Sequence, residues 1–388
     1  MAQAQVARGL EGVVSHSTQL SEVDGTAGRL IIRGFDIDQL VGHVCFEEAA
    51  YLVWHGDLPT RDQLDELRAQ MARARQLPAP ILEWLRGPGQ QAEGMHALRM
   101  AASMLTLDEP DPDDITASAS LQRAIRLTAR IPVLVAQHAR ARRGAAPVEA
   151  PTHLGVAASF LYLLEGQEPE PWRVEALDAY LVAVIEHGMN ASTFTARVIA
   201  STGSDMVSAL TGAIGALKGP LHGGVPGPVL RMLTEIGTPD RAEEWVRGAL
   251  ARGELIMGFG HRVYKVRDPR AAVLTRVATR LSDATGDRRL LELTQAVERV
   301  TVDVLAEVKP GRDLHANMEL YAALVLHGVG IPPELFTPTF AVARTAGWTA
   351  HILEQYGDNR LIRPQSIYDG RRERRFAPID ERSAPSER

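Results

Sequence analysis

The chain has almost no cysteine and no long apolar run. Its 388 residues include a single cysteine, Cys45, which excludes an internal disulfide framework and a cysteine-built metal site. So little cysteine fits a reducing compartment. No apolar run reaches the length of a membrane-spanning helix, and residues 1–10 lack the apolar stretch of a secretory signal. We therefore expect a cytoplasmic protein without a membrane segment.

Aromatic residues and several well-known motifs are also scarce. Aromatic side chains make up 5% of the chain, whereas hydrophobic residues make up 45%, and the abundance of Ala, Leu and Arg favours helix over strand. The net charge of −6 argues against a nucleic-acid partner. The sequence contains no GxxxxGK[ST], HExxH or GxSxG motif and no GxGxxG after a strand. These absences weigh against kinase, zinc protease, α/β-hydrolase and dehydrogenase functions.

The remaining patterns predict an all-α protein with a small N-terminal β-hairpin. Residues 12–14 and 30–32 read as two strands on either side of a turn at residues 24–25. Helical patterns follow almost everywhere, including residues 174–202, where His187 and Asn190 should share one helix face.

A change in polarity along the chain predicts two domains. Charge rises and hydrophobicity falls over residues 218–319, and strongly apolar helices return afterwards. We therefore expect a large helical domain, residues 1–217 and 320–388, and a smaller helical domain, residues 218–319.

Two segments place a histidine among glycines, where the backbone can approach a ligand closely. Residues 219–224 read GPLHGG around His222, and residues 258–265 read GFGHRVYK around His261. The DPR sequence that follows the second segment predicts a helix start with Asp268 as cap and Pro269 in the first turn. Arg270 would then lie where the helix dipole disfavours a cation, which indicates either an anion-binding site or an ordinary surface arginine.

Two further charges fall in apolar helices. Arg344 lies in a segment that is apolar on nearly every face, so it needs either a structural carboxylate or a substrate carboxylate as partner. Glu319 should lie in the first turn of a helix capped by Asn317. Burial and the helix dipole act on its carboxyl in opposite directions, so it is either a general base or a structural acid paired with an arginine.

Taken together, these segments resemble the citrate synthase family. The resemblance rests on an ordered series that spans most of the chain: residues 33–37 (RGFDI), the His187 region, 219–224, 258–265, 268–270, 336–338 (FTP), 343–348 (ARTAGW) and 362–364 (IRP). Each motif is modest by itself, but their order along one chain is highly specific.

The resemblance implies a citrate synthase-like two-domain helical homodimer, an acyltransferase of the tricarboxylic acid cycle that binds oxaloacetate and acetyl-CoA in a cleft. It implies that His187, His261, Arg270 and Arg344 surround oxaloacetate, and that Arg363 reaches the site of the partner subunit. His222 would polarise the acetyl thioester. Arg262 and Lys265 would contact the phosphates of CoA. No metal and no permanently bound cofactor is expected.

One position departs from the family pattern. The family's usual base is an aspartate in a sequence like Asn-Val-Asp-Phe, whereas residues 317–320 read Asn-Met-Glu-Leu. We expect Glu319 to act as the base, although the longer side chain is also compatible with slower condensation or another acyl-CoA. Two alternatives stay open: a 2-methylcitrate synthase that uses propionyl-CoA, and a non-catalytic, ligand-binding family member.

Overall fold

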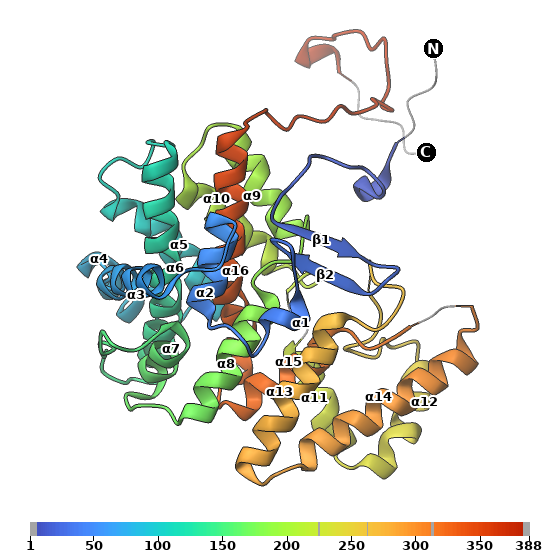
Figure 1. Cartoon of the computed structure of the whole chain (residues 1–388). Coiled ribbons are helices and arrows are strands. Elements are labelled where there is room, and N and C mark those ends of the chain that lie inside the picture. The colour runs from blue at the N-terminus through green and yellow to red at the C-terminus, as the bar shows by residue number, and fades with distance from the viewer. Residues whose placement is uncertain (1–5, 224–225, 262, 312–313, 383–388) are drawn as a thin grey trace. The chain divides into compact units, whose positions relative to one another are not determined.

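The chain divides into two compact units, which we call the helical unit and the terminal unit. The helical unit is Thr18–Leu361, and the terminal unit combines Met1–Ser17 with Ile362–Arg388. The computed structural model describes residues 6–223, 226–261, 263–311 and 314–382. Within these residues, every α-helix and β-strand belongs to the helical unit, whereas the terminal unit has only short 3-10 turns, at Arg8–Leu10 and Ile379–Glu381 (Figure 1).

A small antiparallel sheet opens the helical unit. Its strands, in spatial order, are β1 (Ser21–Asp24), β2 (Arg29–Ile32) and β3 (Phe35–Asp36). The register pairs Ser21 with Ile32 and Ile31 with Asp36. The small N-terminal hairpin is therefore present, with one additional short strand.

The first strand of this sheet is not the predicted one. Residues 12–14 form no strand, and the partner of β2 is the segment directly before the turn. The carboxylate of Asp24 accepts hydrogen bonds from the N–H groups of Thr26 and Ala27, at 2.9 and 2.8 Å. This side-chain turn reverses the chain at once, so the residues just before Asp24 meet β2.

Helices form the rest of the unit. Those before residue 218 are α1 (Ile37–Leu40), α2 (Phe46–His55), α3 (Arg61–Ala74), α4 (Ala79–Arg86), α5 (Gly94–Met104), α6 (Ala117–Arg142), α7 (Val156–Glu165), α8 (Pro171–Val184), α9 (Ala191–Ser201) and α10 (Met206–Leu217). Those after it are α11 (Pro226–Ile236), α12 (Ala242–Ala251), α13 (Pro269–Thr285), α14 (Arg289–Val308), α15 (Met318–Gly328) and α16 (Phe336–Gly357). The all-α expectation is confirmed.

The predicted continuous helical pattern over residues 174–202 is interrupted. α8 ends at Val184 and α9 begins at Ala191, so His187 lies in a loop. Gly188 has a φ of +58°, a backbone conformation that does not continue a helix. Asn190 accepts a hydrogen bond from the N–H of Thr193 at 3.1 Å and is the N-cap of α9. The shared helix face predicted for His187 and Asn190 is therefore wrong.

Two helices connect the parts of the core. α16 is buried along most of its length and packs against α2, α6 and α9, between which it runs in Figure 1. α13 packs against both α15 and α8, so it joins the more polar stretch of the chain to the rest of the helical unit. The predicted domain boundaries, at 217/218 and 319/320, stay a prediction.

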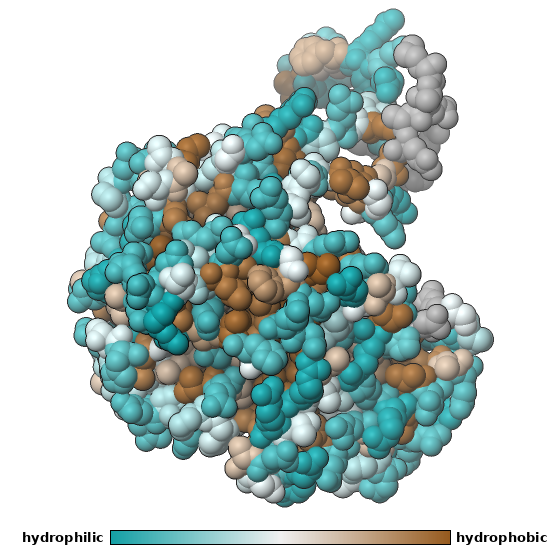
Figure 2. Space-filling model, in the orientation of Figure 1, coloured by the Kyte–Doolittle hydropathy of each residue, from teal (hydrophilic) through white to brown (hydrophobic). Residues whose placement is uncertain are grey.

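One face of the structure shows how polar and apolar side chains are distributed on its surface. Hydrophilic side chains predominate on the face shown in Figure 2, where apolar side chains form small patches. Among the residues that the structure describes, no helix is long and apolar enough to span a bilayer.

Candidate active site

Hydrogen bonds join the His261 segment to the start of α15, the helix that carries Glu319. The carbonyl of Gly258 accepts a hydrogen bond from the N–H of Asn317, and the carbonyl of Gly260 accepts one from its side-chain Nδ2, both at 2.9 Å. Asn317 also caps α15, because its Oδ1 accepts from the N–H of Glu319 at 3.0 Å. One asparagine therefore ties the histidine segment to the predicted base, and the predicted cap of α15 is confirmed.

The glycines of this segment are required by the backbone. Gly258 and Gly260 have φ values of +84° and +82°, which side chains other than glycine rarely adopt. A Cβ atom at Gly258 would also lie 3.1 Å from the Cβ of Leu320 in α15. The segment can approach α15 this closely only because it is glycine-rich.

Asp268 and Arg270 form a buried ion pair at the start of α13. Asp268 caps the helix, Pro269 occupies its first turn, and both predictions are confirmed. The guanidinium of Arg270 donates two hydrogen bonds to Asp268, at 3.1 and 2.7 Å. The second oxygen of Asp268 also accepts from the N–H of Met318, at 3.3 Å. Arg270 is thus a buried, oriented cation rather than a surface arginine.

Arg344 is buried in α16 and has a polar contact and an aromatic one. Its Nε donates to the carbonyl of Val184 at 2.8 Å, and its guanidinium carbon lies 4.8 Å from the centre of the Phe340 ring. Gly347, one turn later, permits this approach, because a Cβ there would lie 2.2 Å from the carbonyl oxygen of Ile185. Among the described residues no carboxylate forms an ion pair with Arg344. The buried carboxylate of Glu186 acts on Arg344 electrostatically without forming an ion pair with it, so both partners left open by the sequence, a structural and a substrate carboxylate, stay open.

The loop that carries His187 is held by its neighbours. Glu186, fully buried, accepts hydrogen bonds from the hydroxyl of Ser21 in β1 and from Nε2 of His351 in α16, both at 3.0 Å. The same carboxylate accepts from the N–H of Gly188. The N-terminal sheet and α16 therefore fix the backbone on both sides of His187.

Three aromatic rings meet at this loop. Nε2 of His187 shares a hydrogen bond of 3.1 Å with the hydroxyl of Tyr264. The rings of His187 and His261 lie 5.5 Å apart, and the ring of Tyr264 lies 4.8 Å from that of His261. The fold thus brings His187 and His261 together although they are far apart in the sequence.

His222 lies in the turn after α10 and faces the start of α9. Its Nε2 accepts a hydrogen bond from the N–H of Ser192 at 3.3 Å and lies 2.8 Å from the hydroxyl of the same serine. A backbone N–H can only donate, so neutral His222 carries its proton on Nδ1. Gly223 allows the tight turn, because a Cβ there would lie 2.5 Å from the carbonyl oxygen of Leu217.

The same reasoning sets the tautomer of His261. Its Nδ1 accepts from the N–H groups of Val263 and Tyr264, at 3.0 and 3.1 Å, so its proton lies on Nε2. Each of the two histidines therefore presents one ring N–H as a hydrogen-bond donor.

All three histidines are neutral near pH 7. Burial lowers the pKa of His222 to about 4, helped by Arg344, and lowers that of His261 to about 4, helped by Arg270. Burial followed by the charges of Arg270 and Arg344 holds the pKa of His187 well below 6.5. These side chains can polarise a carbonyl by hydrogen bonding without carrying a charge themselves.

The carboxyl of Glu319 is buried, and the charges of Arg270 and Arg344 act on it. Burial raises the pKa of its carboxyl to about 7, against the opposing effect of Arg270. Its Oε2 is buried and has no hydrogen-bond partner among the described residues. Burial also lowers the pKa of Arg344, to about 10, so that arginine stays charged. The arrangement is suited to binding a dicarboxylate and removing a proton from a weak carbon acid.

Some predicted residues do not join this cluster. The side chain of Lys265 is exposed, and its backbone N–H donates to the carbonyl of Gly25 at 2.8 Å. Arg262 lies outside the described residues. Arg363 lies in the terminal unit, where its side chain is exposed. The roles expected for these three residues stay predictions.

Sequence reasoning missed several residues of the site. Tyr264, which contacts both His187 and His261, lies inside the quoted GFGHRVYK segment and was available as a polar aromatic beside a histidine. Ser192 shares the same short stretch as His187, but nothing local links it to His222. Tyr180, described below, is a lone phenol in an apolar helix, which is the only signal that it carries in the sequence.

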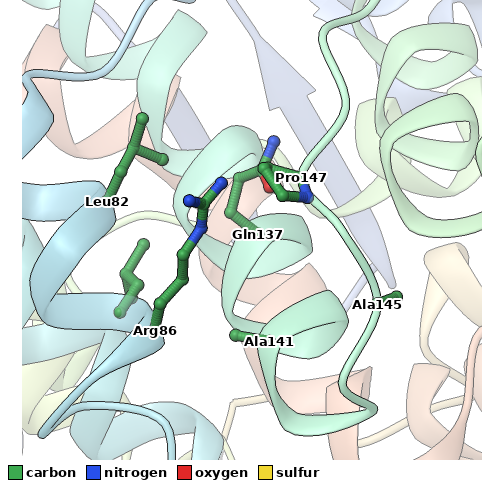
Figure 3. Close-up of a pocket in the computed structure, with 7 residues that line it drawn as sticks. Leu82, Arg86, Gln137, Ala141, Ala145 and Pro147 are labelled. Atoms are coloured by element: carbon green, nitrogen blue, oxygen red, sulfur yellow. The ribbon is translucent and has the colours of Figure 1, made fainter.

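Two cavities lie away from the cluster. The one in Figure 3, between α4 and α6, encloses about 10 Å³ beside Leu82, Arg86 and Gln137, which suffices for about one water molecule. A larger one, about 350 Å³, is lined by parts of α8 and α13 and by residues 42–45. Neither contains a predicted site residue, so the chemistry is argued from the histidine–arginine–glutamate cluster.

Comparisons with known proteins show one family across the chain. Residues 9–365 match the family model described as citrate synthase, C-terminal domain. The chain is 46% identical to citrate synthase 2 of Bacillus subtilis, over 97% of this chain and 99% of that protein. It is 38% identical to a 2-methylcitrate synthase of Mycobacterium tuberculosis, over 95% and 92% of the two chains.

A solved structure is similar throughout the fold. It is the ternary complex of carboxymethyl coenzyme A and oxaloacetate with citrate synthase from Thermoplasma acidophilum. The TM-score is 0.90 at 28% identity, over 97% of this chain and 100% of that one.

Proposed function

Because the chain belongs to the citrate synthase family, we propose that it condenses acetyl-CoA with oxaloacetate and hydrolyses the product to citrate and CoA. The enzyme is then an acyltransferase that converts its acyl group into an alkyl group. The observation that carries the proposal is the buried carboxyl of Glu319, with its pKa near 7, beside the buried cations Arg270 and Arg344.

Oxaloacetate is a dianion and matches these cations. Arg270 is oriented by Asp268, and Arg344 is held by the carbonyl of Val184, so each guanidinium is pre-positioned before the substrate arrives. Paired N–H donors fix a carboxylate in orientation as well as in place. His187 completes this part of the site from the neighbouring loop.

In this proposal Glu319 is the base that removes a proton from the acetyl methyl group. A carboxylate whose pKa lies near the working pH is a stronger base than an ordinary glutamate, and about half of it is still ionised. The developing oxyanion of the thioester needs a donor, and Nδ1–H of His222 is the ring proton that Ser192 leaves available. The roles that we propose for Glu319 and His222 rest on the raised pKa of the carboxyl and on the contact of His222 with Ser192.

Carbon–carbon bond formation needs a polarised ketone. Nε2–H of His261 donates to the ketone oxygen of oxaloacetate while the enol or enolate carbon attacks its carbonyl carbon. Water then attacks the carbonyl carbon of the citryl thioester, and the C–S bond breaks to release CoA and citrate. Holding both reactants in line can supply several kcal/mol, at most about 7–11.

Assembly and location are part of the proposal. We expect a cytoplasmic homodimer in which Arg363 completes the site of the partner subunit. The segment after Arg363 exposes large apolar side chains, among them Tyr368 at 61%, Phe376 at 84% and Ile379 at 70%. Exposed apolar clusters of this kind are covered in protein–protein interfaces. Residues 218–319 would move as a unit to close the site around oxaloacetate.

The acyl group is the open choice within the family. The similarity to a 2-methylcitrate synthase keeps propionyl-CoA as the second candidate. One methylene in a pocket changes transition-state binding by only about 1–3 kcal/mol, so both thioesters are expected to react. Lys265 and Arg262 remain the proposed contacts for the phosphates of CoA.

One assay tests these assignments. Free thiol is measured after the protein is mixed with oxaloacetate and either acetyl-CoA or propionyl-CoA, and kcat/KM is compared. Release of CoA that depends on oxaloacetate, with the higher kcat/KM for acetyl-CoA, supports the citrate synthase assignment. A higher value for propionyl-CoA supports a 2-methylcitrate synthase. No release with either thioester, from protein that binds oxaloacetate, supports the non-catalytic alternative.

A further inference from the structure

Tyr180 is a fully buried phenol whose hydroxyl has no hydrogen-bond partner among the described residues. It lies in α8 with 0% of its surface exposed. Buried hydroxyl groups are almost always paired, because they lose their hydrogen bonds to water and gain nothing in return. Other buried hydroxyls among the described residues are also unpaired, those of Ser120, Thr128, Thr193, Thr211 and Thr301. The reason to look for a ligand at Tyr180 is therefore the set of charged groups around its hydroxyl.

The surroundings of Tyr180 are those of the candidate active site. The charges that act on its hydroxyl are Glu319, Arg344 and Arg270. Val184, one turn further along the same helix, accepts the hydrogen bond from Arg344. α13, α15 and α16, which carry Arg270, Glu319 and Arg344, all pack against α8. Three elements of the site therefore converge on the helix that carries Tyr180.

The hydroxyl can only act as a neutral hydrogen-bond donor or acceptor. Burial raises the pKa of Tyr180 well above 10, and Glu319 adds to the effect, so the proton stays on the phenol. The charges of Arg344 and Arg270 act on this hydroxyl, and positive charges of this kind attract an anion toward it. A protonated phenol beside two arginines offers an anion one more hydrogen bond.

We propose that Tyr180 is a further substrate-binding residue, whose hydroxyl donates a hydrogen bond to a carboxylate oxygen of the dicarboxylate held by Arg270 and Arg344. This inference rests on the proposed function and adds a residue to it. Glu319 is the competing partner, since its Oε2 is also unpaired, but that oxygen lies beyond hydrogen-bond distance of the Tyr180 hydroxyl. The substrate supplies the acceptor that the protein lacks.

The test compares Tyr180→Phe with a matched control. Phe keeps the ring packing and removes only the hydroxyl. The control is Tyr356→Phe, because the hydroxyl of Tyr356 donates to the carbonyl of Ser204 at 2.6 Å and its aromatic ring is likewise largely covered. Calorimetry gives the Kd for oxaloacetate, and thermal unfolding gives the Tm with and without oxaloacetate.

A role in binding and a structural role predict opposite results. For Tyr180→Phe we expect the Kd for oxaloacetate to rise about tenfold or more, the ligand-free Tm to stay equal or increase, and the Tm shift caused by oxaloacetate to shrink. For Tyr356→Phe we expect a lower ligand-free Tm and an unchanged Kd.

Two results would overturn the inference. If Tyr180→Phe binds oxaloacetate within twofold of the wild type, the hydroxyl does not contact the substrate, whatever happens to kcat. A lower ligand-free Tm with an unchanged Kd would assign it a structural role. If the wild type itself binds no oxaloacetate, the proposed function fails together with the inference, whereas a wild type that binds and turns over isolates the failure to Tyr180.

Discussion

Asp268 holds Arg270 in the same geometry as Asp287 holds Arg289, but only the first pair is buried. In both pairs the aspartate accepts a hydrogen bond from the arginine N–H two residues later and receives its guanidinium. Asp268 is the N-cap of α13, whereas Asp287 lies one residue before the N-cap of α14. The side chains of Arg270 and Asp268 are 4% and 0% exposed, whereas those of Arg289 and Asp287 are 91% and 48% exposed. One local arrangement thus occurs in two electrostatic environments.

This repetition provides a controlled test of the buried pair. We expect Asp268→Asn to lower the free energy of unfolding by about 3 kcal/mol, because it leaves the buried charge of Arg270 without its partner. It should also raise the Kd for oxaloacetate, since the guanidinium loses its orientation. Urea denaturation and calorimetry measure the two effects. Asp287→Asn, the exposed counterpart, should change neither, and equal losses from both variants would contradict the role given to burial.

Glu319→Gln tests the proposed base. Gln keeps the shape of the side chain but cannot accept a proton, so we expect kcat to fall by about 10²–10⁴ while the Kd for oxaloacetate stays within a few fold. Thiol release and calorimetry measure these quantities. Glu334→Gln, at an exposed position before α16, is the control and should leave kcat unchanged. Near wild-type turnover of Glu319→Gln would remove Glu319 from the role of base.

The pH dependence of activity should report Glu319. A base works only when ionised, so kcat/KM should rise about tenfold per pH unit up to pH 7 and level off above it. His222 and His261, whose pKa values lie at about 4, should add no limb near neutrality. Stopped assays at constant ionic strength between pH 5 and 9 measure the profile. A flat profile across pH 7 would contradict this assignment.

The same pKa predicts an effect on stability. Because burial raises the folded pKa of Glu319 from its ordinary 4.5 to about 7, the folded state favours the protonated form. Its contribution to stability is therefore fully present below about pH 4.5 and is lost as pH rises through 7. Glu319→Gln removes this dependence, so the stability difference between variant and wild type should change over that window in denaturation experiments.

Arg363 should act across a dimer interface. Hybrids between Arg363→Ala and Glu319→Gln subunits would contain one site with both changes and one with neither. After random co-refolding of two inactive parents, we expect about one quarter of wild-type activity, since half of the dimers are hybrids with one intact site. Analytical ultracentrifugation confirms dimers, and mass-tagged subunits confirm mixing. Mixed but inactive hybrids would show that Arg363 does not complement the partner's site.

Closure of the proposed small domain should be visible in hydrogen exchange. Oxaloacetate contacts both halves of the site, so it should favour the closed state and protect amides near residues 217–218 and 319–320. The comparison is made with and without saturating oxaloacetate. Identical protection in the two samples would reject closure as a rigid-body motion of residues 218–319, while leaving the chemistry intact.

The sequence by itself determined what depends on neighbouring residues. Asn317 and Asp268 cap their helices, and Pro269 occupies a first turn, because capping is a contact over two or three residues. The histidine–glycine segments could also be recognised from the sequence, since a left-handed backbone at Gly258 and Gly260 favours glycine whatever surrounds it. The order of these motifs was enough to indicate the family.

Only the tertiary structure decided what depends on burial and on distant partners. His187 lies in a loop rather than on a helix, because Glu186 is held there by Ser21 and His351 from other parts of the chain. The pKa of Glu319 and the unpaired hydroxyl of Tyr180 follow from the removal of water by packed helices. Desolvation is a property of the whole packed core, so no local pattern in the sequence contains it.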